Sequence, residues 1–335
     1  MILRDNWKTA KKYLEYRQVV LQNDHKTIRS GWIALKHILQ WLDNMPLGSA
    51  PRKRPTLPEY LLHARNDGKP DPLSPAHMAK VLTWARGLFE WLRVEHPTTY
   101  RTISPAWIET LQVRRSASIK SRLVRHQFWT LEDVLTVVRY PVITLRMKRD
   151  RAALAFIFLS GIRGGAFVTL PIRSVDLPNM RVFQLPEWGV QTKNSKAAIT
   201  YLLPISELLE VVKEWDDYVR SRAENQNTAW YTKMDYQAFD ILPDDLVGQS
   251  PVSGRRSQLY QGLRELCDLA GVEWKSPHKI RHGHGVYGRR RVKNMDDYKA
   301  LSKNMMHETV VTTDKIYADM DDDEVGNIIS RMTPE

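Results

Sequence analysis

Apolar residues recur every three or four positions through much of the first third of the chain. One such stripe covers residues 27–42, and a second covers residues 78–92, after Ser74-Pro75. This spacing places the apolar side chains on one face of a helix. Serine followed by proline is typical of a helix start, because the hydroxyl caps the first turn and proline fits the first helical position. We therefore expect an all-α helical bundle over residues 1–115.

A different pattern follows residue 128. Thr130, with Asp133 three positions later, is typical of a helix that begins with a capping box. Beyond it, apolar helical stripes alternate with short runs rich in β-branched residues, and turn-forming residues 192–196 separate two of those runs as a hairpin tip. The pattern predicts helices over 149–159 and 257–270 and strands over 181–185 and 198–203. We expect a mainly α domain with a small antiparallel β-sheet, an α+β domain over residues 129–335.

Residues 116–128 join the two patterns and show no sustained periodicity. Basic residues stand among serines there, which is typical of a flexible linker. The net charge of +12 favours a polyanionic partner, because each Lys or Arg on a phosphate releases condensed counterions. An ordinary solvated loop in a basic enzyme has the same composition. The candidate DNA contacts in this region are Arg114, Arg115, Lys120 and Arg122.

The cysteine content and the hydropathy narrow the class of protein. The single cysteine, Cys267, excludes an internal disulfide and any cysteine-based zinc cluster, and its apolar helical surroundings predict a core position. The longest apolar run, residues 152–162, is too short to span a bilayer. We expect a cytoplasmic protein that has no membrane contact.

Groups suited to chemistry at a phosphate are scattered through the second domain. His278 and Arg281 are three positions apart, so they lie on one face of a helix and can reach one anionic group. A guanidinium holds phosphate oxygens with paired donors, an imidazole relays protons, and a phenol is a nucleophile. Taken singly, each is more often a structural or solvated side chain. The candidates in chain order are Arg163, Lys193, His278, Arg281, His307 and Tyr317.

The order of these residues resembles that of the tyrosine recombinase (phage integrase) family. Its members carry an arginine in a Gly-(Leu/Ile)-Arg segment, as in Gly161-Ile162-Arg163. They carry a lysine in a Thr-Lys-x-x-x-Lys hairpin, to which residues 192–196 are similar with one residue fewer. They also carry His-x-x-Arg-His, as in residues 278–282, and Thr-Thr-x-x-Tyr, which residues 313–317 resemble. These spaced motifs agree in order, and the resemblance covers nearly the whole chain.

The resemblance implies a fold and an activity. Residues 1–115 would form a SAM-like core-binding domain that binds DNA, and residues 129–335 a catalytic domain ending in a C-terminal helix. The enzyme would be a site-specific recombinase or integrase that cleaves and rejoins DNA through a 3′-phosphotyrosyl intermediate. It would use no metal or other cofactor and would be associated with the nucleoid.

Each candidate receives a role from the same resemblance. Tyr317 would be the nucleophile, and the two arginines, Arg163 and Arg281, would neutralise the phosphate. His278 would relay the tyrosine proton, and His307 would hydrogen-bond a phosphate oxygen. Lys193 would protonate the departing 5′-hydroxyl.

The implied partners are double-stranded DNA recombination sites and further copies of the chain in a tetramer on DNA. Exchange of the apolar C-terminal stripe, residues 325–332, between copies would hold the tetramer, although packing on its own domain is equally open. Accessory DNA-bending or directionality proteins are further implied partners. Another basic cluster would contact phosphates or else form a solvated helix end; it consists of Arg289, Arg290, Arg291 and Lys293.

Three departures from the family pattern predict a divergent member. Ala166 stands where the family usually has an acidic residue, Met306 replaces a usual glycine, and the interval from His307 to Tyr317 is one residue longer. Two other functions remain open. A type IB topoisomerase or telomere resolvase would use the same residues on one duplex, but the dedicated helical domain favours a recombinase. A DNA-binding regulator would keep the fold without activity, but the full set of candidate residues argues against it.

Overall fold

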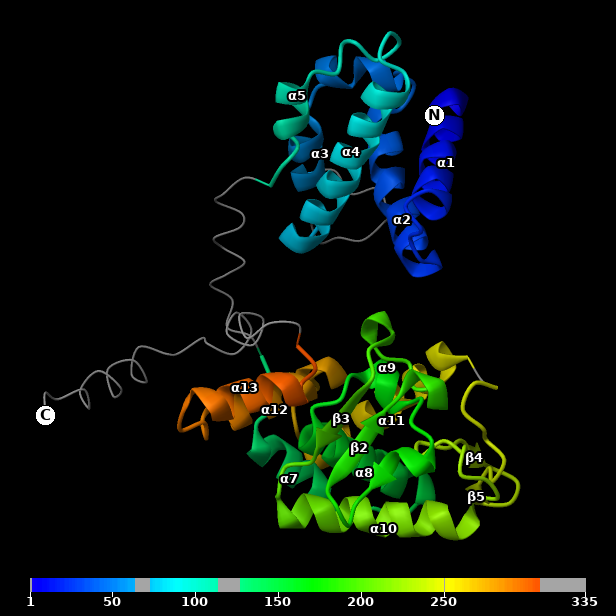
Figure 1. Ribbon diagram of the computed structural model, residues 1–335, viewed down its shortest axis with the longest axis vertical. Coiled ribbons are helices and arrows are strands. Elements are labelled where there is room, and N and C mark those ends of the chain that lie inside the picture. The colour runs from blue at the N-terminus through cyan, green and yellow to red at the C-terminus, as the bar shows by residue number, and fades with distance from the viewer. Residues whose placement is uncertain (1, 64–72, 114–126, 250, 308–335) are drawn as a thin grey trace, which may run out of the picture. The chain divides into compact units, whose positions relative to one another are not determined.

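The structure, a computed structural model, describes residues 2–63, 73–113, 127–249 and 251–307 (Figure 1). The chain divides into two units, Met1–Arg125 and His126–Glu335. Helices dominate both units, and the second also contains a small antiparallel sheet, so the predicted fold class is confirmed. The predicted linker, residues 116–128, lies outside the described residues as far as residue 126.

The first unit is a bundle of helices, with no strand among its described residues. Both helices predicted from the apolar stripes begin at a capped position. The side-chain oxygens of Asp24 and Ser74 each accept a hydrogen bond from the backbone N–H three residues later. The helices are α1 (Arg4–Val19), α2 (His25–Leu42), the 3₁₀ helix η1 (Leu47–Arg52), α3 (Leu57–His63), α4 (Pro75–Glu95) and α5 (Pro105–Glu109).

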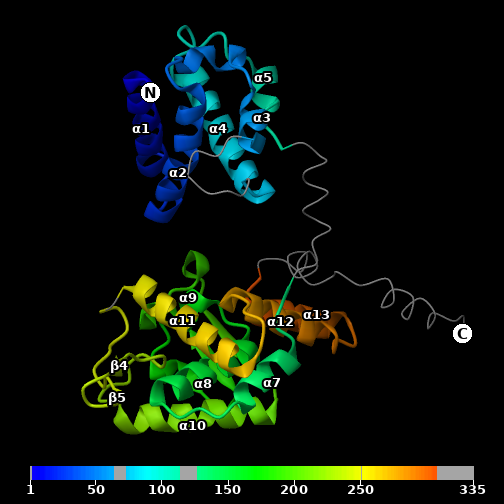
Figure 2. The same ribbon diagram turned by 180° about the vertical axis from the view of Figure 1, so that it is seen from behind.

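The second unit begins with the predicted capping box. The Thr130 hydroxyl accepts from the Asp133 N–H, and the Asp133 carboxylate accepts from the Thr130 N–H. Figure 2 shows the same helices from behind. The helices of this unit are α7 (Leu131–Arg139), α8 (Leu145–Ser160), α9 (Gly164–Phe167), α10 (Ser206–Arg222), α11 (Val252–Ala270), α12 (Pro277–Arg289) and α13 (Met295–Asn304).

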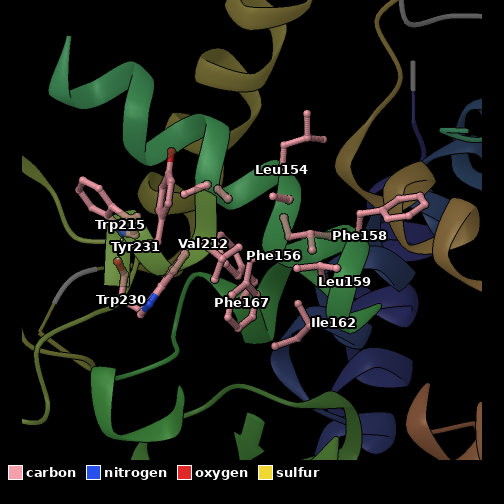
Figure 3. Close-up of a cluster of buried hydrophobic side chains, with 14 of the residues drawn as sticks. Leu154, Phe156, Phe158, Leu159, Ile162, Phe167, Val212, Trp215, Trp230 and Tyr231 are labelled. Atoms are coloured by element: carbon pink, nitrogen blue, oxygen red, sulfur yellow. Dashed lines mark hydrogen bonds between the residues drawn. The ribbon is translucent and has the colours of Figure 1, made fainter. Parts of the chain in front are cut away.

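Helix α8 lies at the centre of the second unit and is packed by α7, α10, α11 and α12. It is apolar on nearly every side from Ala152 to Leu159, as expected of a helix buried all round. Figure 3 shows Phe156 against Phe167 and Trp230, with ring centroids 5.6 and 4.8 Å away. Cys267 is also buried in this core, as predicted. Helix α8 ends at Ser160, and buried Ile162 and Phe167 keep the segment that carries Arg163 against this core.

A three-stranded antiparallel sheet has the order β1 (Val175–Asp176), β2 (Arg181–Gln184), β3 (Ala198–Tyr201). The two predicted strands correspond to β2 and β3. The predicted hairpin is confirmed, because β2 and β3 pair antiparallel and residues 192–196 lie in their connection. This connection is longer than a tight turn and contains two 3₁₀ helices, η3 (Pro186–Trp188) and η4 (Lys193–Ser195). Asn194 and Ser195 have φ of 57° and 50°, so the chain turns within η4. The remaining elements are η2 (Ile172–Ser174) and the hairpin β4 (Met234–Asp235) with β5 (Asp240–Ile241).

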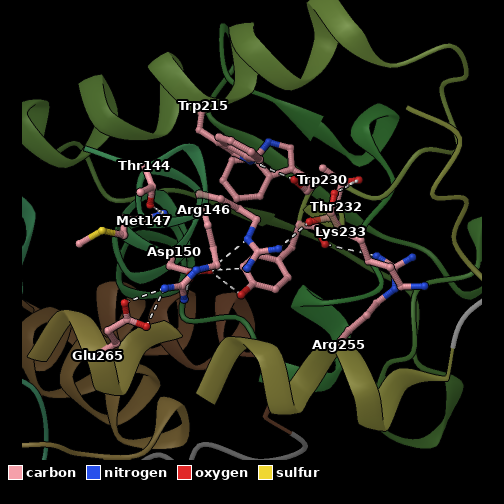
Figure 4. A network of polar contacts seen from close by, with 12 residues as sticks. Thr144, Arg146, Met147, Asp150, Trp215, Trp230, Thr232, Lys233, Arg255 and Glu265 are labelled. Atoms are coloured by element: carbon pink, nitrogen blue, oxygen red, sulfur yellow. Dashed lines mark hydrogen bonds and ion pairs between the residues drawn. The ribbon is translucent and has the colours of Figure 1, made fainter. Parts of the chain in front are cut away.

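A buried polar network joins α8 to α11 and to the segment before β4 (Figure 4). The Asp150 carboxylate accepts hydrogen bonds from Arg149 Nε at 3.0 Å and from the Tyr231 hydroxyl at 2.6 Å. Burial raises the pKa of the Asp150 carboxyl. Gly262 on α11 leaves room for it, because a Cβ there would lie 2.0 Å from Asp150 Oδ2. The network therefore fixes how closely α11 approaches α8.

Candidate active site

Arg281 links three segments that are far apart in the sequence. Its side chain on α12 is buried, with 4% of its surface exposed. One guanidinium nitrogen, Nη1, donates to the carbonyl oxygen of Gly161, and the other, Nη2, donates to the carbonyl oxygen of Met305. Gly161 lies two residues before Arg163, and Met305 lies two residues before His307. A single side chain thus holds the backbone segments that carry two other candidates.

The turn before Arg163 depends on a glycine. Gly161 ends α8 with φ of +61°, and a Cβ there would lie 2.6 Å from Cδ2 of His284. The His284 ring is fully buried, and its Nδ1–H donates to the Phe158 carbonyl at 2.7 Å. Burial lowers the pKa of His284 to about 4, so the ring is neutral. Arg163 follows at the start of α9, half-buried.

The two candidate histidines lie within the electrostatic reach of both arginines. Partial desolvation, then the charges of Arg281 and Arg163, lower the pKa of His278. His307 is 9% exposed, and burial together with the same two charges lowers its pKa to about 4. Both imidazoles are therefore mainly neutral at pH 7. The ring of His278 also packs edge-on against His282, with centroids 4.7 Å apart. Arg163, His278, Arg281 and His307 form one cluster, which we call the arginine–histidine cluster.

Residues 192–196, here called the lysine loop, run between β2 and β3. Lys193 is exposed at the start of η4. The positive charge of Lys196, at the other end of the loop, also lowers the pKa of His307. Lys196 therefore lies close enough to act on the cluster, a role that the sequence reasoning did not assign. The sequence did contain a signal for this role, because Lys196 is the second lysine of the segment that resembles Thr-Lys-x-x-x-Lys.

Two departures from the family pattern have a structural setting. Ala166 is buried on α9, with 2% of its surface exposed, so an acidic residue there would have to be desolvated. Met306 has φ of +52°, in the left-handed region that glycine enters without strain. A non-glycine residue in this region is strained by about 1–2 kcal/mol. The structure thus gives a conformational reason for a glycine before the last histidine.

The basic cluster at the end of α12 is largely at the surface. Arg290, Arg291 and Lys293 are exposed, and Arg289 is half-buried. The Arg291 guanidinium carbon lies 3.5 Å from the ring centroid of Tyr287, a cation–π contact. Tyr317 and the candidate DNA contacts Arg114, Arg115, Lys120 and Arg122 lie outside the described residues, as do the acidic and apolar segments that follow Tyr317.

None of the described helices is both long and apolar enough to cross a membrane. In the same described ranges, no three His, Cys, Asp or Glu side chains are grouped as metal ligands.

Comparison with known proteins finds a matching family and solved structures with similar folds. The model of the phage integrase family matches residues 129–324, more than half of the chain. Three solved structures with similar folds are recombinases or integrases on DNA. They are the XerH site-specific recombinase on a palindromic difH substrate (14% identity, 97% of this chain and 84% of that one, TM-score 0.61), a lambda integrase dimer on a COC′ core site (13%, 95% and 95%, 0.60) and the Tn1549 transposon integrase with circular intermediate DNA (13%, 97% and 99%, 0.59). No curated protein matches the chain significantly.

Proposed function

Because the chain belongs to the phage integrase family, we propose that it is a site-specific recombinase or integrase that cleaves and rejoins DNA through Tyr317. The observation that carries this proposal is the arginine–histidine cluster. In it, Arg281 bonds the carbonyls of Gly161 and Met305 and so brings the first arginine segment beside the last histidine segment. The two guanidinium groups make the cluster cationic, and Arg163 and His278 are not buried, so a phosphodiester can approach them.

The reaction proceeds by attack of the Tyr317 hydroxyl oxygen on the phosphorus. A phosphorus–oxygen bond to tyrosine forms, the bond to the 5′-oxygen breaks, and the tyrosine proton leaves the phenol. Arg163 and Arg281 present N–H donors to the nonbridging oxygens, where negative charge accumulates in the transition state. Religation reverses the same steps with a new 5′-hydroxyl. The guanidinium charges neutralise the phosphate, so the scheme uses no metal or other cofactor.

The protonation states of the histidines suit these roles. A neutral His278 accepts the tyrosine proton directly or through a relay, since its pKa is lowered. A neutral His307 donates an N–H to a phosphate oxygen. An arriving phosphate raises both pKa values again, because a nearby negative charge favours the protonated imidazole. Proton acceptance thus becomes easier once DNA is bound.

Lys193 serves as the general acid for the departing 5′-oxygen. Its exposed position in the lysine loop leaves the ammonium group accessible to DNA. Lys196 contributes positive charge near His307 in the same loop.

Double-stranded DNA is the proposed substrate, and the helical unit Met1–Arg125 is its proposed core-binding domain. The fold neighbours support this, since they are complexes with DNA and, for lambda integrase, include a tetramer bound to a Holliday junction. The net charge of +12 has the sign that such a partner requires. Assembly of four copies on DNA, with exchange of the C-terminal segment, belongs to the same proposal.

Trapping on DNA tests the proposal. A nicked suicide duplex loses its short 5′-hydroxyl strand after cleavage, so a phosphotyrosyl adduct accumulates and migrates slowly in a denaturing gel. Wild type is expected to form this adduct and Tyr317→Phe is not, while the two bind DNA equally. Absence of the adduct with wild type on its mapped site would reject the enzyme and favour a DNA-binding regulator. An adduct that still forms with Tyr317→Phe would show that Tyr317 is not the nucleophile.

A second assay separates recombination from topoisomerase activity. A recombinase is expected to produce joint molecules from two duplexes that carry the site. Relaxation of supercoils without any joint molecule would instead indicate a type IB topoisomerase-like reaction on one duplex.

A further inference from the structure

Asn304, the last residue of α13, makes a reciprocal pair of hydrogen bonds with the end of strand β3. Its Oδ1 accepts from the Tyr201 backbone N–H at 2.7 Å, and its Nδ2 donates to the Tyr201 carbonyl at 3.0 Å. The two residues are separated by 103 positions in the chain. Both bonds use the amide of one side chain, so the contact is specific for asparagine in donor and acceptor alike.

The two bonds occur on the edge of the sheet that no other described strand borders. Strand β3 is the outer strand, because the order is β1-β2-β3. The next residue, Leu202, directs its N–H to the opposite side and donates to the Met180 carbonyl at 3.0 Å. The Asn304 amide therefore takes the place that a neighbouring strand would have on the far edge of Tyr201. It fixes the edge of β3 against the end of α13.

The residues after Asn304 belong to the arginine–histidine cluster. The Met305 carbonyl accepts from Arg281, and the His307 N–H donates to the Ser302 carbonyl of α13 at 3.1 Å. The segment that follows Asn304 is therefore fixed both to Arg281 and to the last turn of α13. The amide connects strand β3 to a segment whose position the cluster itself determines.

The lysine loop leads directly into β3, so it is held at both ends. Before the loop, the Gln191 N–H donates to the Thr169 hydroxyl at 2.9 Å, just after α9. The same hydroxyl donates to the Ala166 carbonyl at 3.0 Å, which ties the start of the loop to the helix that follows Arg163. After the loop, β3 pairs with β2, and its far end at Tyr201 is bonded to Asn304. The loop therefore spans from the arginine side of the cluster to the histidine side.

We infer that Asn304 is a positioning residue that holds the lysine loop against the arginine–histidine cluster. The inference rests on the proposed function, in which Lys193 protonates the 5′-oxygen. Without the Asn304 amide, the far end of β3 at Tyr201 loses both bonds to α13, and only the pairing with β2 still holds the strand that carries the loop. The loop then holds Lys193 less firmly against the scissile phosphate. The loss falls on protonation of the leaving group and leaves attack by tyrosine unchanged.

A change of leaving group isolates this effect. The suicide duplex is prepared with its natural 5′-bridging oxygen and, separately, with sulfur in that position. A thiol is a much stronger acid than an alcohol, so a thiolate departs without a proton. Asn304→Ala is expected to slow adduct formation on the oxygen duplex about tenfold to a hundredfold, a part of the roughly hundredfold to ten-thousandfold that a general acid contributes, because Lys193 itself remains. On the sulfur duplex its rate is expected within about threefold of wild type.

Asn294→Ala is the matched control, because Asn294 caps the other end of the same helix. Its side chain accepts from the Asp297 N–H at 2.8 Å and does not touch β3. Loosening α13 from that end is expected to change both substrates by the same factor. Asn304→Asp keeps the acceptor for Tyr201 and loses the donor, so a folded variant with the same sulfur rescue is available if the alanine variant does not fold.

The outcomes separate the inference from the function on which it rests. Equal slowing of Asn304→Ala on oxygen and sulfur, or no slowing on oxygen, overturns the positioning role while Lys193→Ala is still rescued by sulfur. Failure of sulfur to rescue Lys193→Ala overturns the role of the lysine, and with it the inference. An unreactive wild type on both duplexes overturns the proposed function itself.

Discussion

Replacing Gly161 by alanine tests whether a buried imidazole shapes the turn that presents Arg163. The substitution has two consequences that the structure separates. Alanine at φ of +61° is strained, and its Cβ would lie 2.6 Å from Cδ2 and 2.9 Å from Nε2 of His284. Gly271 provides the matched control, because its φ is +68° and nothing lies within 4 Å of a Cβ there. Gly271→Ala therefore introduces the backbone strain alone.

The expected magnitudes follow from these two terms. Left-handed strain costs about 1–2 kcal/mol in both variants. Overpacking against His284 adds about 1–3 kcal/mol in Gly161→Ala alone, because the ring is enclosed and hydrogen-bonded to Phe158. We expect a loss of unfolding free energy of about 2–5 kcal/mol for Gly161→Ala and about 1–2 kcal/mol for Gly271→Ala.

Urea unfolding followed by circular dichroism measures both losses, and the two sites share one unit, so the same transition is compared. In the folded fraction, Gly161→Ala is also expected to lower adduct formation about a hundredfold, since a displacement near 1 Å of a catalytic group has that effect. Adding His284→Ala to Gly161→Ala should recover about 1–3 kcal/mol relative to additivity. Equal destabilisation by Gly161→Ala and Gly271→Ala would refute the contact with His284.

Two further predictions concern the buried side chains of Asp150 and His284 in the same unit. Gly262→Ala should lower the unfolding free energy by about 2–4 kcal/mol, because its Cβ would lie 2.0 Å from Asp150 Oδ2. Gly254→Ala on the same helix meets nothing within 4 Å and should be neutral or stabilising by up to about 1 kcal/mol; urea midpoints that coincide would contradict the packing. His284→Asn should flatten the pH dependence of stability. The folded pKa of His284 is about 4, below its unfolded value. The contribution of His284 to stability is therefore fully present above pH 6.5 and is lost as the pH falls towards 4. The His284 share is about 3 kcal/mol, and unchanged pH curves from urea titrations of the variant would show that another group carries it.

The helices and the two longer strands were predictable because their signals are local. Apolar stripes place α2, α4 and α8, and the candidate residues Arg163, His278 and Arg281 stand in short segments that the sequence makes recognisable. The lysine loop was predicted only as a turn, since turn-forming residues do not distinguish a tight hairpin from a longer connection with 3₁₀ helices.

Long-range contacts left no such signal. The bond from Arg281 to the Gly161 carbonyl joins residues 120 positions apart, and its acceptor is a backbone atom present at every position. Asn304 is one polar residue at the end of a helix, and nothing in its neighbours indicates Tyr201 as its partner. His284 likewise follows the motif on a helix face that the sequence identifies only as partly apolar. The geometry that orients the candidate groups therefore depends on tertiary packing alone.

This packing also bears on Ala166, which stands where the family usually has an acidic residue. An acidic residue at a position with 2% exposure would place negative charge beside the arginine segment. With alanine there, the segment is held instead through the Gly161 carbonyl, which accepts from Arg281 without neutralising it. The charges that lower the pKa values of His278 and His307 are all positive. Each imidazole is therefore mainly neutral while the site is empty. Under the proposed function, a bound DNA phosphate would raise both pKa values and so make His278 a better proton acceptor.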